Sequence, residues 1–170
     1  MGLHERIGAS PAVLLDASLR SIEIGRVGEN LAAFYLESLG IGCTIVDRRG
    51  SDIWCSLPNG HMLRIEVKTA TKMTKQEFVQ NGVQRCYEKY YFGISKTNLT
   101  ADYFCFVNLT NNIVLFVPRS EMTEGSSKWI KEEEFTERKM KSSLRDMLLR
   151  HVCDLPESLR VTKKGLGRES

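Results

Sequence analysis

The sequence predicts an α/β domain with a mixed central β-sheet, flanking helices and a long C-terminal helix. Apolar strand patterns occur over 42–70 and 101–117, and an amphipathic helical pattern over 23–39 precedes them. A second helical pattern follows residue 126. With 170 residues, 42% of them hydrophobic, the chain is long enough for one domain with a sizeable core.

The expected organisation is a single domain over residues 1–155, with its core at about 22–120 and a C-terminal helix at about 126–152. A flexible basic tail is expected over 156–170. The five cysteines are dispersed without a C-x-x-C pair, which suits reduced core thiols. No apolar stretch is long enough to cross a bilayer, and the first residues lack a signal-peptide pattern. These features favour a cytoplasmic protein without membrane contact.

The overall charge of the chain is mildly basic. It contains 24 Lys and Arg against 21 Asp and Glu, which gives a net charge of +3 and a pI near 8.6. A balance of this size permits nucleic-acid binding but does not require it. Whether the chain binds nucleic acid therefore depends on where its charges lie.

The helix over 23–39 is expected to end at Gly40, a residue suited to a left-handed C-terminal cap. Gly28 and the alanines that follow it permit close packing on a sheet. Glu29 lies beside this small-residue surface, and two interpretations of it are open. Its carboxylate either points at a metal or is an ordinary acid of the first turn, favoured by the helix dipole. A shorter helix over 10–19 is expected to cover an edge of the domain or to contact another copy.

The stretch 50–70 predicts a β-hairpin around the loop Pro58-Asn59-Gly60. With Leu57 opposite His61, Asp52 faces Glu66 across the strand pair. Because side chains alternate along a strand, one face of the hairpin is apolar and the other is charged. The apolar face is Ile53, Cys55, Leu63, Ile65 and Val67, and the charged face carries Asp52, Glu66 and Lys68.

Two acids and an amine on one face of a strand pair indicate a functional site, because facing carboxylates repel each other and are unfavourable for stability alone. A divalent metal would relieve this repulsion, and hard oxygen ligands at this spacing suit Mg²⁺. Lys68 could then orient the attacking water or stabilise charge that develops on a phosphate. The alternative is a surface Glu-x-Lys strand that faces an acid by chance, which is common for so short a motif.

Asp52, Glu66 and Lys68 together resemble the active site of the PD-(D/E)XK nuclease superfamily, and the match extends over about residues 24–120. The helix around Gly28-Glu29 is similar to the helix that supplies an extra Glu in that superfamily. Archaeal Holliday junction resolvases and the small homing endonucleases of this fold are the members that the chain resembles. One departure is Ser51, which stands where the motif has Pro.

This resemblance implies a restriction-endonuclease-like core and a Mg²⁺-dependent DNA endonuclease, either junction-resolving or site-specific, in which Mn²⁺ can substitute. Asp52, Glu66, Glu29 and the Val67 carbonyl would hold one or two metal ions, and Lys68 would assist the water. Cleavage of two strands usually needs two sites, so a homodimer or a larger symmetric oligomer is expected.

Basic residues near the acids are the candidate DNA contacts. They are Arg26, Arg48, Arg49, Arg64, Lys72, Lys75 and Arg85. The Arg48-Arg49 pair is equally explained as surface charges beside a turn. Trp54 falls opposite Arg64, either as a cation–π pair or as a base-stacking and phosphate-holding pair. Tyrosines interleaved with Arg85 and Lys89 suit a nucleic-acid surface, or else occupy the core or an edge.

The remaining segments carry less signal. Residues 69–76 are expected to form a loop or the start of a short helix, and 84–95 become strand-like toward their end. A second hairpin is expected over 101–117, with its turn at 110–112. The helix from 126 to about 152, with a break near Phe135, either packs on the domain or faces DNA or a second copy.

Two further functions remain as alternatives to a nuclease. A non-catalytic nucleic-acid-binding or assembly module of the same fold would bind DNA in a salt-dependent way, without any effect of metal. A metal-dependent enzyme acting on a small phosphorylated molecule would use the acids and leave the dispersed basic residues without a role.

Overall fold

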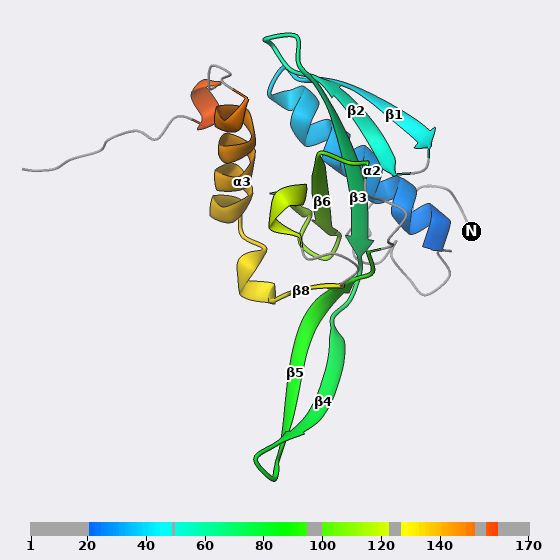
Figure 1. Ribbon diagram of the computed structural model, residues 1–170, viewed down its shortest axis with the longest axis vertical. Helices are drawn as coiled ribbons and strands as arrows, with labels where there is room; N and C mark the ends of the chain where they lie inside the picture. Colours follow the sequence, from blue (N-terminus) through cyan, green and yellow to red (C-terminus); the bar gives the residue numbers. More distant parts are fainter. Residues whose placement is uncertain (1–20, 49, 95–99, 123–126, 152–155, 160–170) are drawn as a thin grey trace, which may run out of the picture.

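The computed structural model describes residues 21–48, 50–94, 100–122, 127–151 and 156–159 (Figure 1). The helix expected over 10–19 and most of the predicted basic tail lie outside these residues, as does Arg49. None of the described helices is long and apolar enough to cross a membrane.

A five-stranded mixed sheet forms the centre of the molecule, with strand order β1-β2-β3-β6-β7. Strands β3 and β6 pair in parallel, and the other neighbours are antiparallel. The strands are β1 Gly42–Arg48, β2 Ser51–Ser56, β3 Met62–Ala70, β6 Tyr103–Asn108 and β7 Ile113–Pro118. The mixed sheet and the second hairpin that the sequence predicts are confirmed.

The β2–β3 hairpin has the predicted register, with Ile53 opposite Ile65 and Cys55 opposite Leu63. Its turn closes as expected: the Leu57 N–H donates to the His61 carbonyl at 2.8 Å, and Gly60 has a φ of +83°. The four paired side chains are almost fully buried. The loop length therefore sets which residues reach the core and which face the other side.

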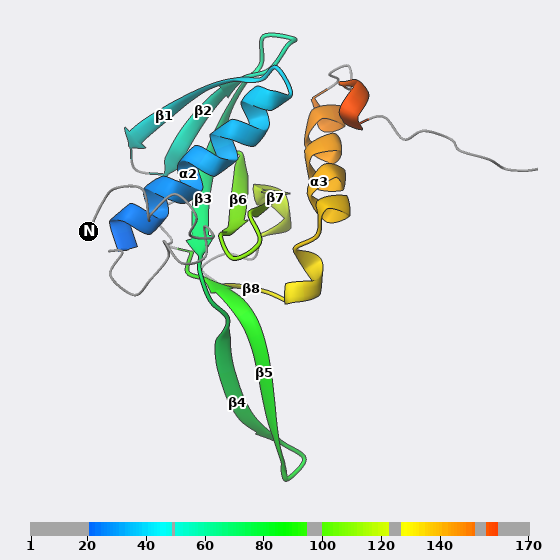
Figure 2. The ribbon, with the colours of Figure 1, turned by 180° about the vertical axis from the view of Figure 1, so that it is seen from behind.

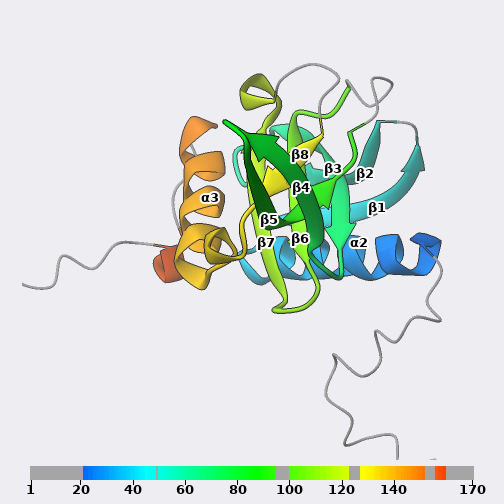
Figure 3. The ribbon, with the colours of Figure 1, turned by 90° about the horizontal axis from the view of Figure 1, so that it is seen from below.

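Helix α2 Ser21–Ser38 lies across β1 and β3 (Figures 2 and 3). Its contact with β3 is close at Gly28, where a Cβ atom would lie 1.9 Å from the Thr69 Oγ1. Only glycine fits there, and this fixes the height of the helix over the sheet. The helix ends as predicted, since Gly40 has a φ of +78° and donates its N–H to the Glu37 carbonyl.

Helix α3 Glu137–Arg150 packs against β7 at the edge of the sheet. It is shorter than the helix predicted over 126–152. Lys128–Ile130 instead form strand β8, and Glu132–Glu134 form a 3-10 turn. The boundary lies where a break was predicted: Phe135 is buried, and the next residue, Thr136, caps the helix by accepting the Lys139 N–H.

Strands β4 Thr74–Gln80 and β5 Val83–Phe92 form a long hairpin that projects from the body (Figures 1 and 2). The prediction of a loop or helix start over 69–76 was wrong, because β3 runs to Ala70 and β4 begins four residues later. The turn is Asn81-Gly82, with φ of 54° and 73°, values that match a type I′ turn. Strand β8 pairs with the base of β5 and completes a three-stranded sheet.

Candidate active site

The candidate site lies where strands β2 and β3 separate. Their ladder ends at Ile53–Ile65, and the next donor on β3, the Val67 N–H, is bound by Asp52 Oδ2 at 2.7 Å. The carboxylate thus satisfies a backbone donor at the point where the ladder stops. This bond holds Asp52 against the segment of β3 that carries Glu66.

Glu66 and Lys68 lie two residues apart on β3 and therefore share one face. Glu66 is only 4% exposed, and the Lys68 Nζ lies 2.6 Å from its Oε1. Their neighbours in the parallel register are Phe104 and Phe106, both fully buried. An ion pair in such apolar surroundings contributes little net stability, so its presence favours a functional role.

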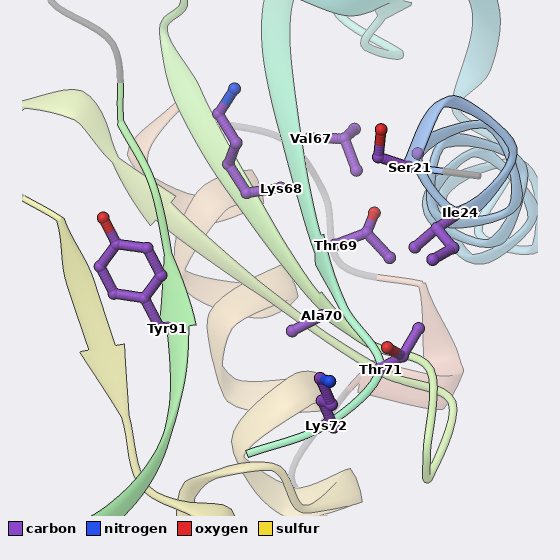
Figure 4. A pocket seen from close by; sticks show the side chains of 10 residues that line it. Ser21, Ile24, Val67, Lys68, Thr69, Ala70, Thr71, Lys72 and Tyr91 are labelled. Carbon is purple, nitrogen blue, oxygen red and sulfur yellow. The ribbon is translucent and has the colours of Figure 1, made fainter. Parts of the chain in front are cut away.

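A pocket of about 340 Å³ opens beside Lys68 (Figure 4). It lies between the first turn of α2, the end of β3 and strand β5. Its walls are Ser21, Ile24, Gly25, Val67, Lys68, Thr69, Ala70, Thr71, Lys72 and Tyr91. In the close view, Thr69 points toward α2, whereas Lys68 points to the other side of β3. Two lysines, Lys68 and Lys72, are among these walls, so the lining suits an anion such as a phosphate.

The oxygen ligands available to a metal are the carboxylates of Asp52 and Glu66. Glu29 is half-buried on α2, one residue after the close contact at Gly28. Within the ranges that the structure describes, no three or more His, Cys, Asp or Glu side chains form a group able to hold a metal ion. A pair of carboxylates nevertheless fits Mg²⁺, which binds one or two protein carboxylates and completes its shell with water and substrate phosphate. A metal role for Glu29 stays a prediction.

The basic residues predicted to bind DNA differ in their surroundings. Arg64 forms an ion pair with Asp102 at 3.2 Å, and its backbone N–H donates to the same carboxylate at 2.8 Å. The hydrogen bond to Asp102 raises the pKa of Arg64. Lys75 pairs with Glu88 at 3.1 Å. The other candidates with a described side chain are exposed, and they are Arg26, Lys72 and Arg85.

Trp54 does lie opposite Arg64, as the register predicted. Its indole N–H donates to Ser51 Oγ at 2.9 Å. Trp54, Arg64 and Asp102 line a second pocket of about 370 Å³ together with Met62 and Leu63. The Arg64 guanidinium therefore already has a carboxylate partner, which makes it a weaker candidate for a phosphate contact.

Two residues near the site escaped the sequence-based prediction. Asp102 comes from the loop before β6, and sequence distance gave no indication that it would meet Arg64. Tyr91 was considered only as one of several tyrosines, but it lines the Lys68 pocket and its ring packs on Trp129 at 4.8 Å. The Asn81-Gly82 pair, a strong hairpin signal, would have placed Tyr91 on a long strand.

Comparison with known proteins gives a likeness in structure but none in sequence family. No protein-family model matches the chain, and a search among curated proteins finds no match. Among solved structures, the bacterial homing endonuclease I-Ssp6803I is similar, with a TM-score of 0.55 and 16% identity. The likeness covers 78% of this chain and 93% of that one. At this identity it establishes the fold: the α/β core with a mixed sheet and flanking helices is one that a nuclease also has.

Proposed function

We propose that the chain is a metal-dependent DNA endonuclease that hydrolyses phosphodiester bonds at Asp52, Glu66 and Lys68. The observation that carries this proposal is the contact set at the split between β2 and β3. Asp52 is bound to the Val67 N–H, and Lys68 Nζ lies 2.6 Å from the buried Glu66. The fold shared with a bacterial homing endonuclease supports the same class of reaction.

In this proposal, Asp52 and Glu66 hold Mg²⁺, or Mn²⁺ in its place, with the Val67 carbonyl and Glu29 as further ligands. Bound Mg²⁺ would supply Lewis-acid stabilisation of the phosphate and lower the pKa of a water molecule. Asp52 suits its role because its backbone bond fixes the carboxylate at the edge of the pocket-lining strand.

Lys68 would supply the positive charge that the reaction needs. Its Nζ is held by the Glu66 carboxylate, so the ammonium has a defined position beside the pocket. In surroundings that exclude much of the water, this charge stabilises an anionic transition state more strongly than it would in solution. The same ammonium can orient an attacking water through a hydrogen bond.

Asp52→Asn tests this assignment, because the amide oxygen can still accept the Val67 N–H while the negative charge is lost. We expect Mg²⁺ affinity in calorimetry and the rate of plasmid nicking to fall together, the rate by at least about a hundredfold. Asp146→Asn, an equal change at an exposed site on α3, is the matched control. Wild-type nicking that is unaffected by chelator, or retained in Asp52→Asn, would refute the proposal.

The same assay addresses the substrate. Supercoiled plasmid, linear duplex and branched junction DNA would be compared at equal concentrations, with sedimentation to determine the oligomeric state. We propose a homodimer or a larger symmetric assembly, because cutting both strands of a duplex calls for two copies of the site.

A further inference from the structure

The β4–β5 hairpin, here called the arm and comprising Thr74–Phe92, is anchored at one end only. At its base, Tyr90 and Phe92 are 2% exposed and pair with β8. Their rings pack on Phe135, at 5.3 Å and 6.1 Å. From Val83 to Glu88 every residue of β5 is exposed. The arm is thus a firmly anchored ribbon whose outer part has no neighbouring strand in the described structure (Figure 1).

Such a ribbon adds little to the stability of the fold, because an isolated pair of strands is marginally stable in water. Beyond the part that pairs with β8, the outward edges of β4 and β5 pair with no other strand of the described structure. The side chains that the arm presents therefore indicate what kind of partner would bind there.

The two faces of the arm differ in charge. The register places Phe78 opposite Arg85 and Gln76 opposite Tyr87, so these four side chains share one face. Lys89 continues this face, which is called the cationic face below, and it carries no carboxylate between Thr74 and Lys89. The opposite face carries Glu77 and the ion pair between Lys75 and Glu88.

Aromatic rings reinforce the cationic face. Phe78 and Tyr87 stack with centroids 5.0 Å apart and planes 19° apart, and the Lys89 Nζ lies 5.1 Å from the Tyr87 ring. These contacts hold Tyr87 and Lys89 in place although both are at least partly exposed to solvent. A row of rings and cations suits a polyanion that carries bases.

The cationic face leads directly to the candidate active site. Alternation along β5 puts Tyr91 on the same side as Arg85, Tyr87 and Lys89. Tyr91 is also a wall of the pocket that Lys68 and Lys72 line (Figure 4). A ligand that lay along the arm would therefore enter the pocket at its base.

We infer that the arm binds duplex DNA in the major groove through its cationic face, and so presents a phosphate of the same duplex to the pocket at Lys68. The major groove accepts a two-stranded ribbon, and Arg and Gln side chains are suited to base edges there. Charge complementarity favours this partner, since the face carries cations and no carboxylate. The inference deepens the proposed function and rests on it for the identity of the ligand.

The dimensions of the ribbon give the reach of this contact. At about 3.3 Å per residue, the segment from Val83 to Tyr91 spans about 26 Å. That length corresponds to roughly eight base pairs at about 3.4 Å each. The arm would thus contact bases well away from the bond that is cut.

Arg85→Ala/Lys89→Ala tests the inference, with binding of a fluorescent duplex measured by anisotropy in chelator and again with Ca²⁺, so that no cleavage intervenes. We expect the affinity to fall at least about tenfold at fixed salt. Lys131→Ala/Lys141→Ala removes the same charge from exposed positions off the arm and should change affinity less than about twofold. Lys89 is half-buried and the other three side chains are exposed, so circular dichroism checks that both variants remain folded.

The outcomes separate the arm from the active site. If the wild-type protein nicks plasmid and the arm variant binds and cuts DNA as well as the control variant does, the arm inference is overturned and the nuclease proposal is retained. If the wild-type protein binds duplex DNA without nicking plasmid, and the arm variant loses this binding, the nuclease proposal is overturned and DNA binding by the arm is supported. The arm inference is also overturned if the wild-type protein binds no duplex DNA. It is overturned as well if the arm variant changes only the sedimentation of the protein and not its DNA binding.

Methylation interference tests the choice of groove. Methylation of guanine N7 lies in the major groove and should weaken binding of wild type more than that of the arm variant. Interference confined to adenine N3, in the minor groove, would overturn the assignment to the major groove.

Discussion

The β2–β3 and β4–β5 hairpins have the same connectivity, yet their charged side chains differ in exposure to solvent. In β2–β3 the charged pair Glu66–Lys68 is enclosed beside the phenyl rings of β6, with Glu66 4% exposed. In the β4–β5 arm the pair Lys75–Glu88 is exposed to solvent. Enclosure increases the strength of an electrostatic interaction, and exposure leaves a charge accessible to a large partner. Under the two proposals above, the first hairpin carries the reaction and the second binds the DNA.

The tips of the two hairpins differ as well. The tip of β2–β3 is fastened to the end of α3, where the Asn59 side-chain amide donates to the His151 carbonyl at 2.6 Å. The His61 and His151 rings also lie close, with centroids 6.0 Å apart. The tip of the arm, by contrast, leaves Val79 71% and Val83 57% exposed.

A clear difference in stability is expected between the two ion pairs. Glu66→Ala removes the buried partner of Lys68, and we expect the free energy of unfolding to fall by about 1–2 kcal/mol in urea denaturation. The figure is modest because the Lys68 side chain is 23% exposed and can turn to water. Glu88→Ala in the arm should leave the midpoint unchanged. Equal shifts in the two variants would break the comparison.

A similar effect is expected from the glycine that seats α2 on β3. Gly28→Ala places a Cβ atom 1.9 Å from Thr69 Oγ1, so the helix must move away from the strand that carries Glu66 and Lys68. We expect a loss of about 1–3 kcal/mol by thermal and urea unfolding. Gly25→Ala, where no atom lies within 4 Å, is the matched control and should be neutral or slightly stabilising. A neutral Gly28→Ala would mean that the close contact does not set the helix position.

The smallest expected effect is a pH dependence at the fastened tip. Burial, followed by the charge of His61, lowers the pKa of His151. The folded state therefore takes up this proton at a lower pH than the unfolded state, whose value is about 6.5. Stability should decline as the pH falls from about 6.5 through the folded-state pKa. In urea titrations at several pH values, His151→Gln should lose the part of this decline in stability that comes from His151. A pH profile of stability that is unchanged in His151→Gln would contradict this prediction.

The sequence predicted the first hairpin because two signals agreed, the Pro58-Asn59-Gly60 turn and the alternation of apolar residues. The turn length predicted Asp52, Glu66 and Lys68 on one face; the structure pairs Glu66 with Lys68 on β3 and binds Asp52 to the Val67 N–H between them. The arm gave only the turn signal, because the outer parts of its strands are exposed on both faces and show no apolar alternation. The Asn81-Gly82 turn was present in the sequence, but no alternation of apolar residues on either side of it supported a hairpin.

Other errors have equally physical causes. A three-residue strand such as β8 is too short to show a period, so Trp129 and Ile130 were assigned to a helical stripe. The partner of Arg64 is Asp102, 38 residues away, and local sequence contains no information on that contact. Arg64 was for this reason predicted to be available for DNA.

Plasmid nicking by Lys68→Ala tests the central claim most directly, because this ammonium distinguishes a catalytic centre from a structural ion pair. We expect wild type to nick supercoiled DNA with Mg²⁺ and not with chelator, and Lys68→Ala to lose at least about a thousandfold in rate. Duplex binding should persist, and Lys141→Ala, on the exposed side of α3, should nick like wild type. Mg²⁺-dependent nicking by folded Lys68→Ala at the wild-type rate would contradict the account.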